Sequence, residues 1–301
     1  MPTIFLHVGL HKTGTTSLQK AFFDNRAALE RQGVLYPRTG LSPKPVNWGH
    51  HELAYALRNR PQGTEMWQAL RKEADAAGLP NVVVSSEELS HLPFPGLPGP
   101  APFKLISEIF EGYDVRLICY LRPQAEMISS LYNHHVKSVG EKRDILEFIA
   151  QVAPRLDYQN YLNVAAHELG TDAIEVRLYQ KSHMKNGDII SDMADRLSID
   201  LTRGFTIRQT ALNSGLTSEG LQAMLEANRR LAGDPEQLKA ERTAIIERHR
   251  APAFYRHQLL SDEILQVIEA LYRNKNRQIA RRFLGRDEPL FALSSEAEAL
   301  A

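Results

Sequence analysis

The stretch from Thr3 to Gln19, TIFLHVGLHKTGTTSLQ, contains the residue types of a phosphate-binding loop. One lysine, Lys12, and two glycines stand between an apolar run and three consecutive hydroxyl residues. Glycine lets backbone amides turn toward a ligand without interference from a Cβ atom. The first turn of a helix adds unpaired N–H groups and about half a positive charge. The segment therefore predicts a buried strand, a turn and a helix start that together bind an anion.

The position of the lysine distinguishes this loop from the nucleoside-triphosphate loop of kinases and ATPases. That loop reads G-x-x-x-x-G-K-[ST], with lysine directly after the second glycine. Here Thr15 follows Gly14, and Lys12 lies two residues before that glycine. Thr16 and Gln19 stand at capping-box spacing, so we expect the helix to begin near Thr16. The alternative is an ordinary strand-turn-helix with a chance lysine. The candidate anion-binding residues are His11, Lys12, Thr13, Gly14, Thr15, Thr16 and Ser17.

Two carboxylates, Glu87 and Glu88, directly follow a second apolar run, NVVVSS, at residues 81–86. At the carboxyl end of a parallel strand, such side chains enter the crevice where doubly wound sheets bind ligands. Either could be a general base, with Glu87 ahead of Glu88; a helix cap beside a solvated side chain and a pair of metal ligands are the alternatives. His50 and His51 are further candidate bases. Neither histidine has a cysteine or carboxylate at a local spacing that completes a metal site.

A third apolar run, Val115 to Leu121, ends at Arg122, and the pattern after it predicts a helix from about Gln124 to Ser138. The guanidinium of Arg122 could form a forked contact with a phosphate, and the hydroxyl of Ser130 could bond the same group. Ser129 is the alternative one residue away, and a solvated polar helix face is the alternative to a binding site. These residues are candidates for a second anion contact.

Two of these motifs resemble those of sulfotransferases that use PAPS (3′-phosphoadenosine 5′-phosphosulfate). HKTGTT followed by a helix resembles the 5′-phosphosulfate loop, and Arg122 with Ser130 eight residues later resembles the 3′-phosphate element. The resemblance implies that Lys12 contacts the bridging oxygen of the donor and stabilises the leaving phosphate. It also supports Glu87 as the base. The implied fold is α/β: a P-loop-type parallel sheet flanked by helices on both faces, with irregular loop insertions.

The predicted reaction is sulfuryl transfer from PAPS to a hydroxyl or amine of an acceptor, with PAP as the product. Glu87, or alternatively Glu88 or His50, removes the acceptor's proton. The sulfuryl group carries one negative charge, unlike a γ-phosphoryl group bridged to Mg²⁺, so no metal is predicted. Long proline-rich loops at 37–49 and 93–102 favour a carbohydrate or glycolipid acceptor. The alternatives are a P-loop kinase that uses ATP and Mg²⁺ and a catalytically silent nucleotide-binding protein.

Composition limits the partners. Lysine and arginine total 36 and aspartate and glutamate total 36, so no net charge attracts nucleic acid or an anionic membrane. The single cysteine, Cys119, lies in an apolar run and is expected to be a buried structural thiol. No apolar run approaches the roughly 18 residues of a membrane span, and no signal peptide precedes the first strand, so we expect a cytoplasmic protein.

The rest of the chain predicts one domain over residues 1–293 and a frayed tail at 294–301. Arg208 and Asn213 lie in a polar loop that could complete a binding site, and the ending NRQIARRFLG resembles the C-terminal helix of bacterial sulfotransferases. Arginines of this ending form either a solvated basic face or a donor contact. Further helices are expected near 65–77, 145–151, 158–169, 188–197, 217–231 and 261–283, and short apolar or strand segments at 34–36 and 174–179; 91–103 is expected to be irregular.

Overall fold

The computed structural model describes residues 1–42, 48–57, 62–91, 102–207, 215–251 and 259–291. The expectations for Arg208, Asn213, the tail at 294–301 and most of the proline-rich 93–102 segment lie outside these residues. The chain divides into two compact units by its internal contacts. The first comprises Met1–Arg122, Asp157–Arg208 and Asn274–Ala301, and the second comprises Pro123–Leu156 and Gln209–Arg273. The single domain expected over 1–293 stays a prediction.

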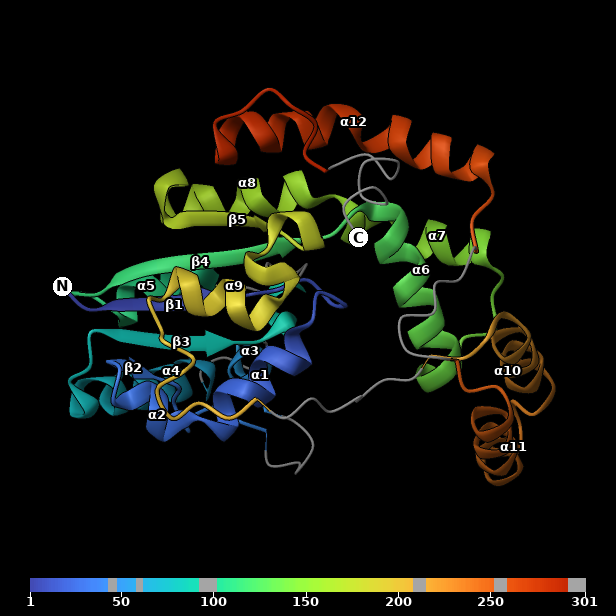
Figure 1. The fold of residues 1–301 in the computed structure, drawn as a ribbon, viewed down its shortest axis with the longest axis horizontal. Coiled ribbons are helices and arrows are strands. Elements are labelled where there is room, and N and C mark those ends of the chain that lie inside the picture. The colour runs from blue at the N-terminus through green and yellow to red at the C-terminus, as the bar shows by residue number, and fades with distance from the viewer. Residues whose placement is uncertain (43–47, 58–61, 92–101, 208–214, 252–258, 292–301) are drawn as a thin grey trace. The chain divides into compact units, whose positions relative to one another are not determined.

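The first unit is built on a sheet of five parallel strands in the order β2-β3-β1-β4-β5 (Figure 1). β1 is central, because Leu6 pairs with Val84 of β3 on one side and with Leu117 of β4 on the other. The carboxyl ends of these three strands therefore lie next to one another, as the apolar runs predicted. The strands are β1 (Thr3–His7), β2 (Val34–Leu35), β3 (Asn81–Ser85), β4 (Asp114–Leu121) and β5 (Ile174–Leu178).

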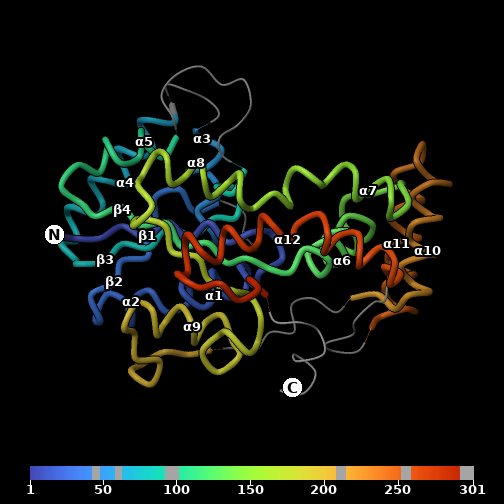
Figure 2. Tube along the Cα trace, turned by 90° about the horizontal axis from the view of Figure 1, so that it is seen from above, coloured from blue at the N-terminus to red at the C-terminus, as the bar shows by residue number. Residues whose placement is uncertain are grey.

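Helices cover both faces of this sheet, which confirms the predicted α/β class (Figure 2). On one face, Phe5, Val83 and Ile118 pack in a common core with Phe22 of α1 and Met193 of α9. Burying each such side chain contributes about 1.5–3 kcal/mol. The helices on this face are α1 (Thr15–Asp24), α2 (Arg26–Glu30) and α9 (Ile189–Arg196); those on the other are α3 (His51–Ala56), α4 (Gln62–Ala77), α5 (Pro102–Ile109) and α8 (Tyr158–Leu169).

The helix after β1 begins differently from the sequence-based expectation. Its N-cap is Gly14 in a left-handed conformation, with φ of 73°, and no side chain caps the first turn. The expected capping box between Thr16 and Gln19 was therefore wrong. The side chain of Gln19 instead turns inward and donates a hydrogen bond to Glu87. Tertiary contact has overridden a local capping preference.

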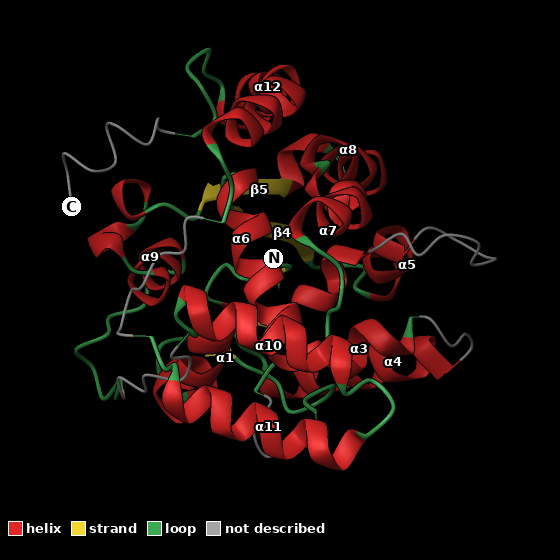
Figure 3. Cartoon of the chain, turned by 90° about the vertical axis from the view of Figure 1, so that its right-hand side faces the viewer, coloured by secondary structure: helices red, strands yellow, loops and turns green. Residues whose placement is uncertain are grey.

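The second unit is helical within its described residues. α10 and α11 lie side by side (Figure 3). Asn228, which is buried, donates hydrogen bonds to the carbonyl oxygens of Val136 and Glu141 and accepts from Arg242. These contacts fix the π-helical turn η2, which replaces the last turn of the helix expected to reach Ser138. The helices are α6 (Gln124–His134), η2 (His135–Val139), α7 (Ile145–Val152), η3 (Ala153–Leu156), α10 (Ser218–Arg230) and α11 (Pro235–Arg248).

Several remaining features complete the described chain. Cys119 is fully buried, and burial raises the pKa of its thiol to about 12, which confirms the expected structural cysteine. Across the described ranges, no helix combines the length and the apolar composition that crossing a membrane requires. The other elements are α12 (Asp262–Leu284) and the 3₁₀ turns η1 (Glu87–His91), η4 (Thr171–Ala173), η5 (Lys181–His183) and η6 (Lys185–Gly187).

Candidate functional site

The loop between β1 and α1 has the backbone conformation of an anion cradle. Lys12 and Gly14 both adopt left-handed φ angles, 67° and 73°. A non-glycine residue in this conformation costs about 1–2 kcal/mol, so the surrounding contacts must hold it. One such contact is the buried hydroxyl of Thr13, which donates to the carbonyl oxygen of Leu10 at 2.6 Å. The expected loop lysine is thus placed in a fixed, strained turn.

α1 begins directly after this turn, at Thr15. The amides of Ser17 and Leu18 donate to the carbonyl oxygen of Gly14, so the amides of Thr15 and Thr16 precede the first hydrogen-bonded turn. The side chain of Thr15 is buried, whereas Thr16 and Ser17 are exposed. This geometry provides the N–H groups and the helix dipole that an anion requires.

Arg122, at the end of β4, lies against the loop. Its Nη1 donates to the carbonyl oxygen of Lys12 at 2.9 Å, and its guanidinium carbon lies 5.7 Å from the ring centroid of Tyr179. The hydroxyl of Tyr158 donates to the Arg122 carbonyl at 2.9 Å. The structure therefore brings together the lysine loop and the arginine that the sequence singled out as two separate motifs.

The serine candidates belong to the second unit, on α6. The hydroxyl of Ser129 donates to the carbonyl oxygen of Ala125 at 3.0 Å, within the helix. This bond occupies the proton of Ser129 and favours Ser130 as the residue that would meet a ligand. The joint action of Ser130 and Arg122 on one phosphate stays a prediction.

Glu87 is held by polar side chains at the carboxyl end of the sheet. Gln19 Nε2 donates to Glu87 Oε2 at 2.8 Å. His51 Nδ1 lies 3.9 Å from the same oxygen and forms a 2.9 Å hydrogen bond with the hydroxyl of Ser86. A Cβ atom on Gly49 would lie 2.7–2.9 Å from the amide atoms of Gln19, so this close approach requires glycine. The arrangement positions one oriented carboxylate.

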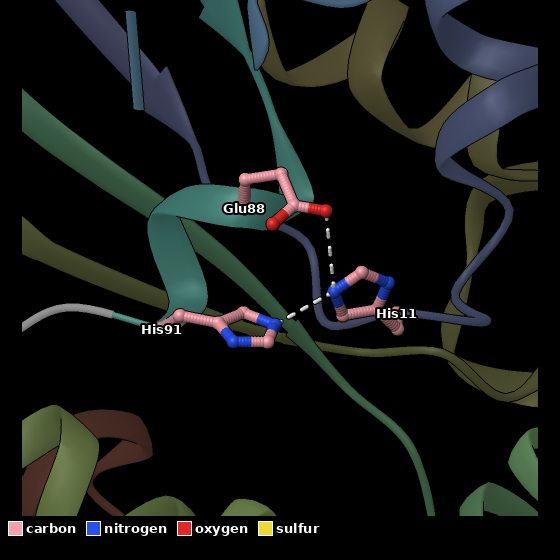
Figure 4. A group of neighbouring side chains, drawn as sticks. All are labelled: His11, Glu88 and His91. Atoms are coloured by element: carbon pink, nitrogen blue, oxygen red, sulfur yellow. Dashed lines mark hydrogen bonds and ion pairs between the residues drawn. The ribbon is translucent and has the colours of Figure 1, made fainter. Parts of the chain in front are cut away.

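Glu88 turns to a different set of side chains. Its Oε1 lies 3.9 Å from His11 Nε2, and His11 Nε2 lies 2.8 Å from His91 Nε2 (Figure 4). His11 comes from the phosphate loop and His91 from the end of η1. The two adjacent glutamates therefore enter two separate polar clusters.

His50 has a structural environment. Its Nε2 donates to the carbonyl oxygen of Pro37 at 3.0 Å, and its Nδ1 accepts from the amide of Ser85 at 3.1 Å. Burial lowers the pKa of His50 to about 4, so the ring is neutral near pH 7. Both ring nitrogens are engaged by backbone groups, which does not favour the expected role of His50 as a base.

His7 is a buried polar residue that sequence reasoning did not single out. Its Nδ1 forms a 2.8 Å hydrogen bond with the hydroxyl of Ser85, and its Nε2 has no hydrogen-bond partner among the described residues. Burial lowers the pKa of His7 to about 4, against the opposing charge of Glu87. A Cβ on Gly9 would lie 2.8 Å from this Nε2, so His7 packs directly beneath the loop. The signal in the sequence was a polar residue ending an apolar run.

The arginines near the end of the chain contact α8 and the turn after it. Arg282 donates to the side-chain oxygens of Asn163 and Thr171, and Arg281 pairs with Asp287. A cavity of about 350 Å³ lies beside them, lined by Gln159, Asn163, Gln278, Ile279, Arg281, Arg282 and Phe283. These contacts engage both arginines with neighbouring side chains, and the two alternatives for this ending, a solvated basic face and a donor contact, stay predictions.

Comparisons with known proteins give matches among solved structures. The chain is similar to a sulfotransferase from Alicyclobacillus acidocaldarius, at 17% identity and a TM-score of 0.39, over 80% of this chain and 95% of that one. It is also similar to a sulfotransferase domain from the curacin biosynthetic pathway, at 14% identity and a TM-score of 0.40, over 84% of this chain and 99% of that one. No family model matches the chain, and no curated protein matches it.

Proposed function

We propose that this chain is a sulfotransferase that moves the sulfuryl group of PAPS to a hydroxyl or amine of an acceptor. The observation that carries the proposal is the bond from Arg122 Nη1 to the carbonyl oxygen of Lys12, which joins two motifs 110 residues apart. A donor with phosphates at both ends of its nucleoside requires two separate anion contacts. The loop supplies the first, and Arg122 supplies a cation for the second.

In the proposed reaction, the loop stabilises the leaving group. We assign Lys12 and the amides of Thr15 and Thr16 to the negative charge that develops as the bond between sulfur and the bridging oxygen breaks. Such preorganised donors contribute several kcal/mol, roughly 3–4 for a single donor. Arg122 and Ser130 would bind the 3′-phosphate, which distinguishes PAPS from ATP. The departing product is PAP.

Glu87 is the proposed general base. Gln19 and His51 both approach Oε2, so we assign the acceptor's proton to Oε1. As the acceptor oxygen or nitrogen forms its bond to sulfur, its proton passes to Glu87 and the bridging oxygen leaves with PAP. A neutral, fully engaged His50 makes the carboxylate the better candidate. We propose a saccharide or glycolipid hydroxyl as the acceptor, on the basis of the long proline-rich loops.

The first test is calorimetric binding of PAP, compared with ADP and with ATP plus Mg²⁺. We expect PAP to bind best, in the presence of EDTA, and Arg122→Ala to weaken it roughly tenfold to a hundredfold, since a hydrogen bond to a charged group contributes about 1.5–3 kcal/mol. Arg203→Ala is the matched control, because this arginine is exposed in the same unit and pairs with Asp200. Circular dichroism checks that both variants fold.

The other outcomes separate the alternatives. If the protein preferred ATP with Mg²⁺, the sulfotransferase proposal would be wrong and a P-loop kinase would become the favoured function. Binding of PAP without transfer of ³⁵S from labelled PAPS to any of a panel of oligosaccharides and glycolipids would support a catalytically silent nucleotide-binding protein. Absence of binding to all three nucleotides would contradict every one of these functions.

A further inference from the structure

A second polar cluster lies beside the phosphate loop and is not used by the proposed reaction. One ligand atom each from His11, Glu88 and His91 lies within 4.8 Å of the other two. Figure 4 shows the two imidazoles and the carboxylate pointing toward one another. All three residues are partly exposed, so an ion in solution could reach them. We propose that these three side chains form a binding site for a divalent transition-metal ion, of which zinc is the best-fitting example.

The distances agree with such a site. Tetrahedral zinc with Zn–N bonds of about 2.0–2.1 Å separates two ligand atoms by about 3.3 Å. The observed separations are 2.8 Å between His11 Nε2 and His91 Nε2, and 3.9 Å between His11 Nε2 and Glu88 Oε1. One is shorter and the other longer than the ideal value by about half an ångström. Binding a common ion would require both separations to change by about this amount.

The donor set selects the class of metal. Imidazole nitrogens suit zinc, copper, iron and nickel, whereas magnesium and calcium prefer oxygen ligands. Three protein ligands leave a fourth position for water. The only cysteine of the chain, Cys119, is fully buried and offers no competing thiolate. The site is therefore one for a borderline transition metal.

A hydrogen bond between the two imidazoles is the simpler account of the 2.8 Å contact. It requires one ring to donate its Nε2 proton to the other, and the 3.9 Å ion pair between Glu88 and His11 then requires a protonated imidazole. A metal ion accounts for all three side chains, because each then presents a lone pair to a common point. Metal binding should consequently weaken as the pH falls and protons compete for the imidazoles.

The fold gives this site a definite place. His11 directly precedes Lys12, while Glu88 and His91 lie three residues apart on η1, which follows β3. A bound ion would link the phosphate loop to η1 across two neighbouring strands. The proposal does not depend on sulfuryl transfer, for which no metal is invoked. It departs from the sequence-based expectation of no metal, because only the fold brings these three side chains together.

The test is Zn²⁺ binding by tag-free protein that has been treated with EDTA and dialysed, measured in competition with a chromogenic chelator. We expect one Zn²⁺ per chain. His91→Ala and Glu88→Gln should each weaken binding at least about tenfold, since even outer-shell changes cost 10–100-fold. His167→Ala is the matched control, because His167 is exposed on α8, and it should bind as the wild type does.

Cobalt gives a second measurement on the same variants. Co²⁺ in a tetrahedral protein site should give strong visible absorption in the wild type and in His167→Ala, and this absorption should be lost in His91→Ala. Near-ultraviolet circular dichroism of the metal-free proteins shows whether the variants fold. If His91→Ala does not fold, the result for Glu88→Gln decides the test. The proposal would be overturned if the wild type bound zinc no more tightly than His91→Ala and Glu88→Gln do. It would also be overturned if the wild type with Co²⁺ gave only the spectrum of hydrated Co²⁺. PAP binding in EDTA is a separate measurement, so either proposal can fail alone.

Discussion

Glu87 and Glu88 are consecutive residues of one 3₁₀ turn, yet their carboxylates lie in different chemical settings. Glu87 accepts a hydrogen bond from the buried amide of Gln19 and lies near His51, whereas Glu88 faces the imidazoles of His11 and His91. With three residues per turn, successive side chains diverge by about 120°. In the two proposals made above, this doubled acidic residue therefore supplies an oriented base in one setting and a metal ligand in the other.

The largest expected effect concerns the base itself. Glu87→Gln should lower the transfer rate by roughly 10²–10⁴-fold, the usual contribution of a general base, while PAP binding stays near the wild-type value. Glu88→Gln should cost much less. The measurement is ³⁵S transfer from saturating PAPS to the oligosaccharide and glycolipid panel, in EDTA. Equal losses in the two variants, or a greater loss in Glu88→Gln, would remove the distinction between the two settings.

A smaller effect should appear in the pH dependence of stability, because two buried histidines, His7 and His50, bond Ser85, two residues before Glu87. His7 and His50 have pKa values lowered to about 4, while an unfolded histidine titrates near 6.5. The unfolded chain therefore binds more protons between these values, and stability must fall as the pH drops from 6.5 to 4. Each histidine contributes up to about 3 kcal/mol to this loss.

Urea unfolding of the wild type and of His50→Gln at several pH values isolates one of these contributions. Glutamine can still donate to the carbonyl oxygen of Pro37 but does not titrate. The wild type should lose about 3 kcal/mol more than the variant between pH 6.5 and pH 4. Parallel curves would mean that His50 is not held neutral in the fold, and would restore it as a candidate base.

The smallest expected effect tests what positions Glu87. In Gly49→Ala the new methyl group would meet the amide of Gln19, which must move and loosen its bond to Glu87. We expect roughly a tenfold loss of transfer, equivalent to about 1.4 kcal/mol, with unchanged PAP binding. Gly233→Ala is the control, since a Cβ there meets nothing within 4 Å. A transfer rate equal to that of the control would show that Gln19 does not position the base.

The sheet and the strand, turn and helix start around Lys12 could be predicted because their signals are local, whereas phosphate binding by this loop stays a prediction. Apolar runs predicted β1, β3, β4 and β5 and marked only a short apolar stretch at β2, and α8 occupies the predicted residues 158–169. The loop required only the order of glycine, lysine and hydroxyl residues. α11 was missed because its apolar residues do not form one stripe along the helix, and α5 was missed because it begins at Pro102, inside a segment whose prolines predicted irregular structure.

The polar clusters could not be predicted, because they depend on pairs distant in the sequence. Gln19 and Glu87 are 68 residues apart, and His11 and His91 are 80 residues apart. Gln19 had a plausible local role as a helix cap, and nothing along the chain indicated that it would turn inward. His50 was a reasonable base until the fold placed backbone partners at both of its nitrogens. The side-chain contacts of this site are therefore set by which strands lie next to each other in the sheet more than by short sequence motifs.

The central place of β1 has a consequence for how the protein forms during synthesis. β1 is made first, yet its two partners, β3 and β4, begin only at Asn81 and Asp114. Parallel pairing between such distant segments is slow, because the intervening chain must be ordered before the contacts form. An emerging chain therefore has an unpaired apolar first strand until more than a quarter of it is made, and that strand lacks its second partner, β4, until more than a third is made. The phosphate loop, which that strand supports, is a late product of folding, and exposed apolar segments of this kind are where chaperones act.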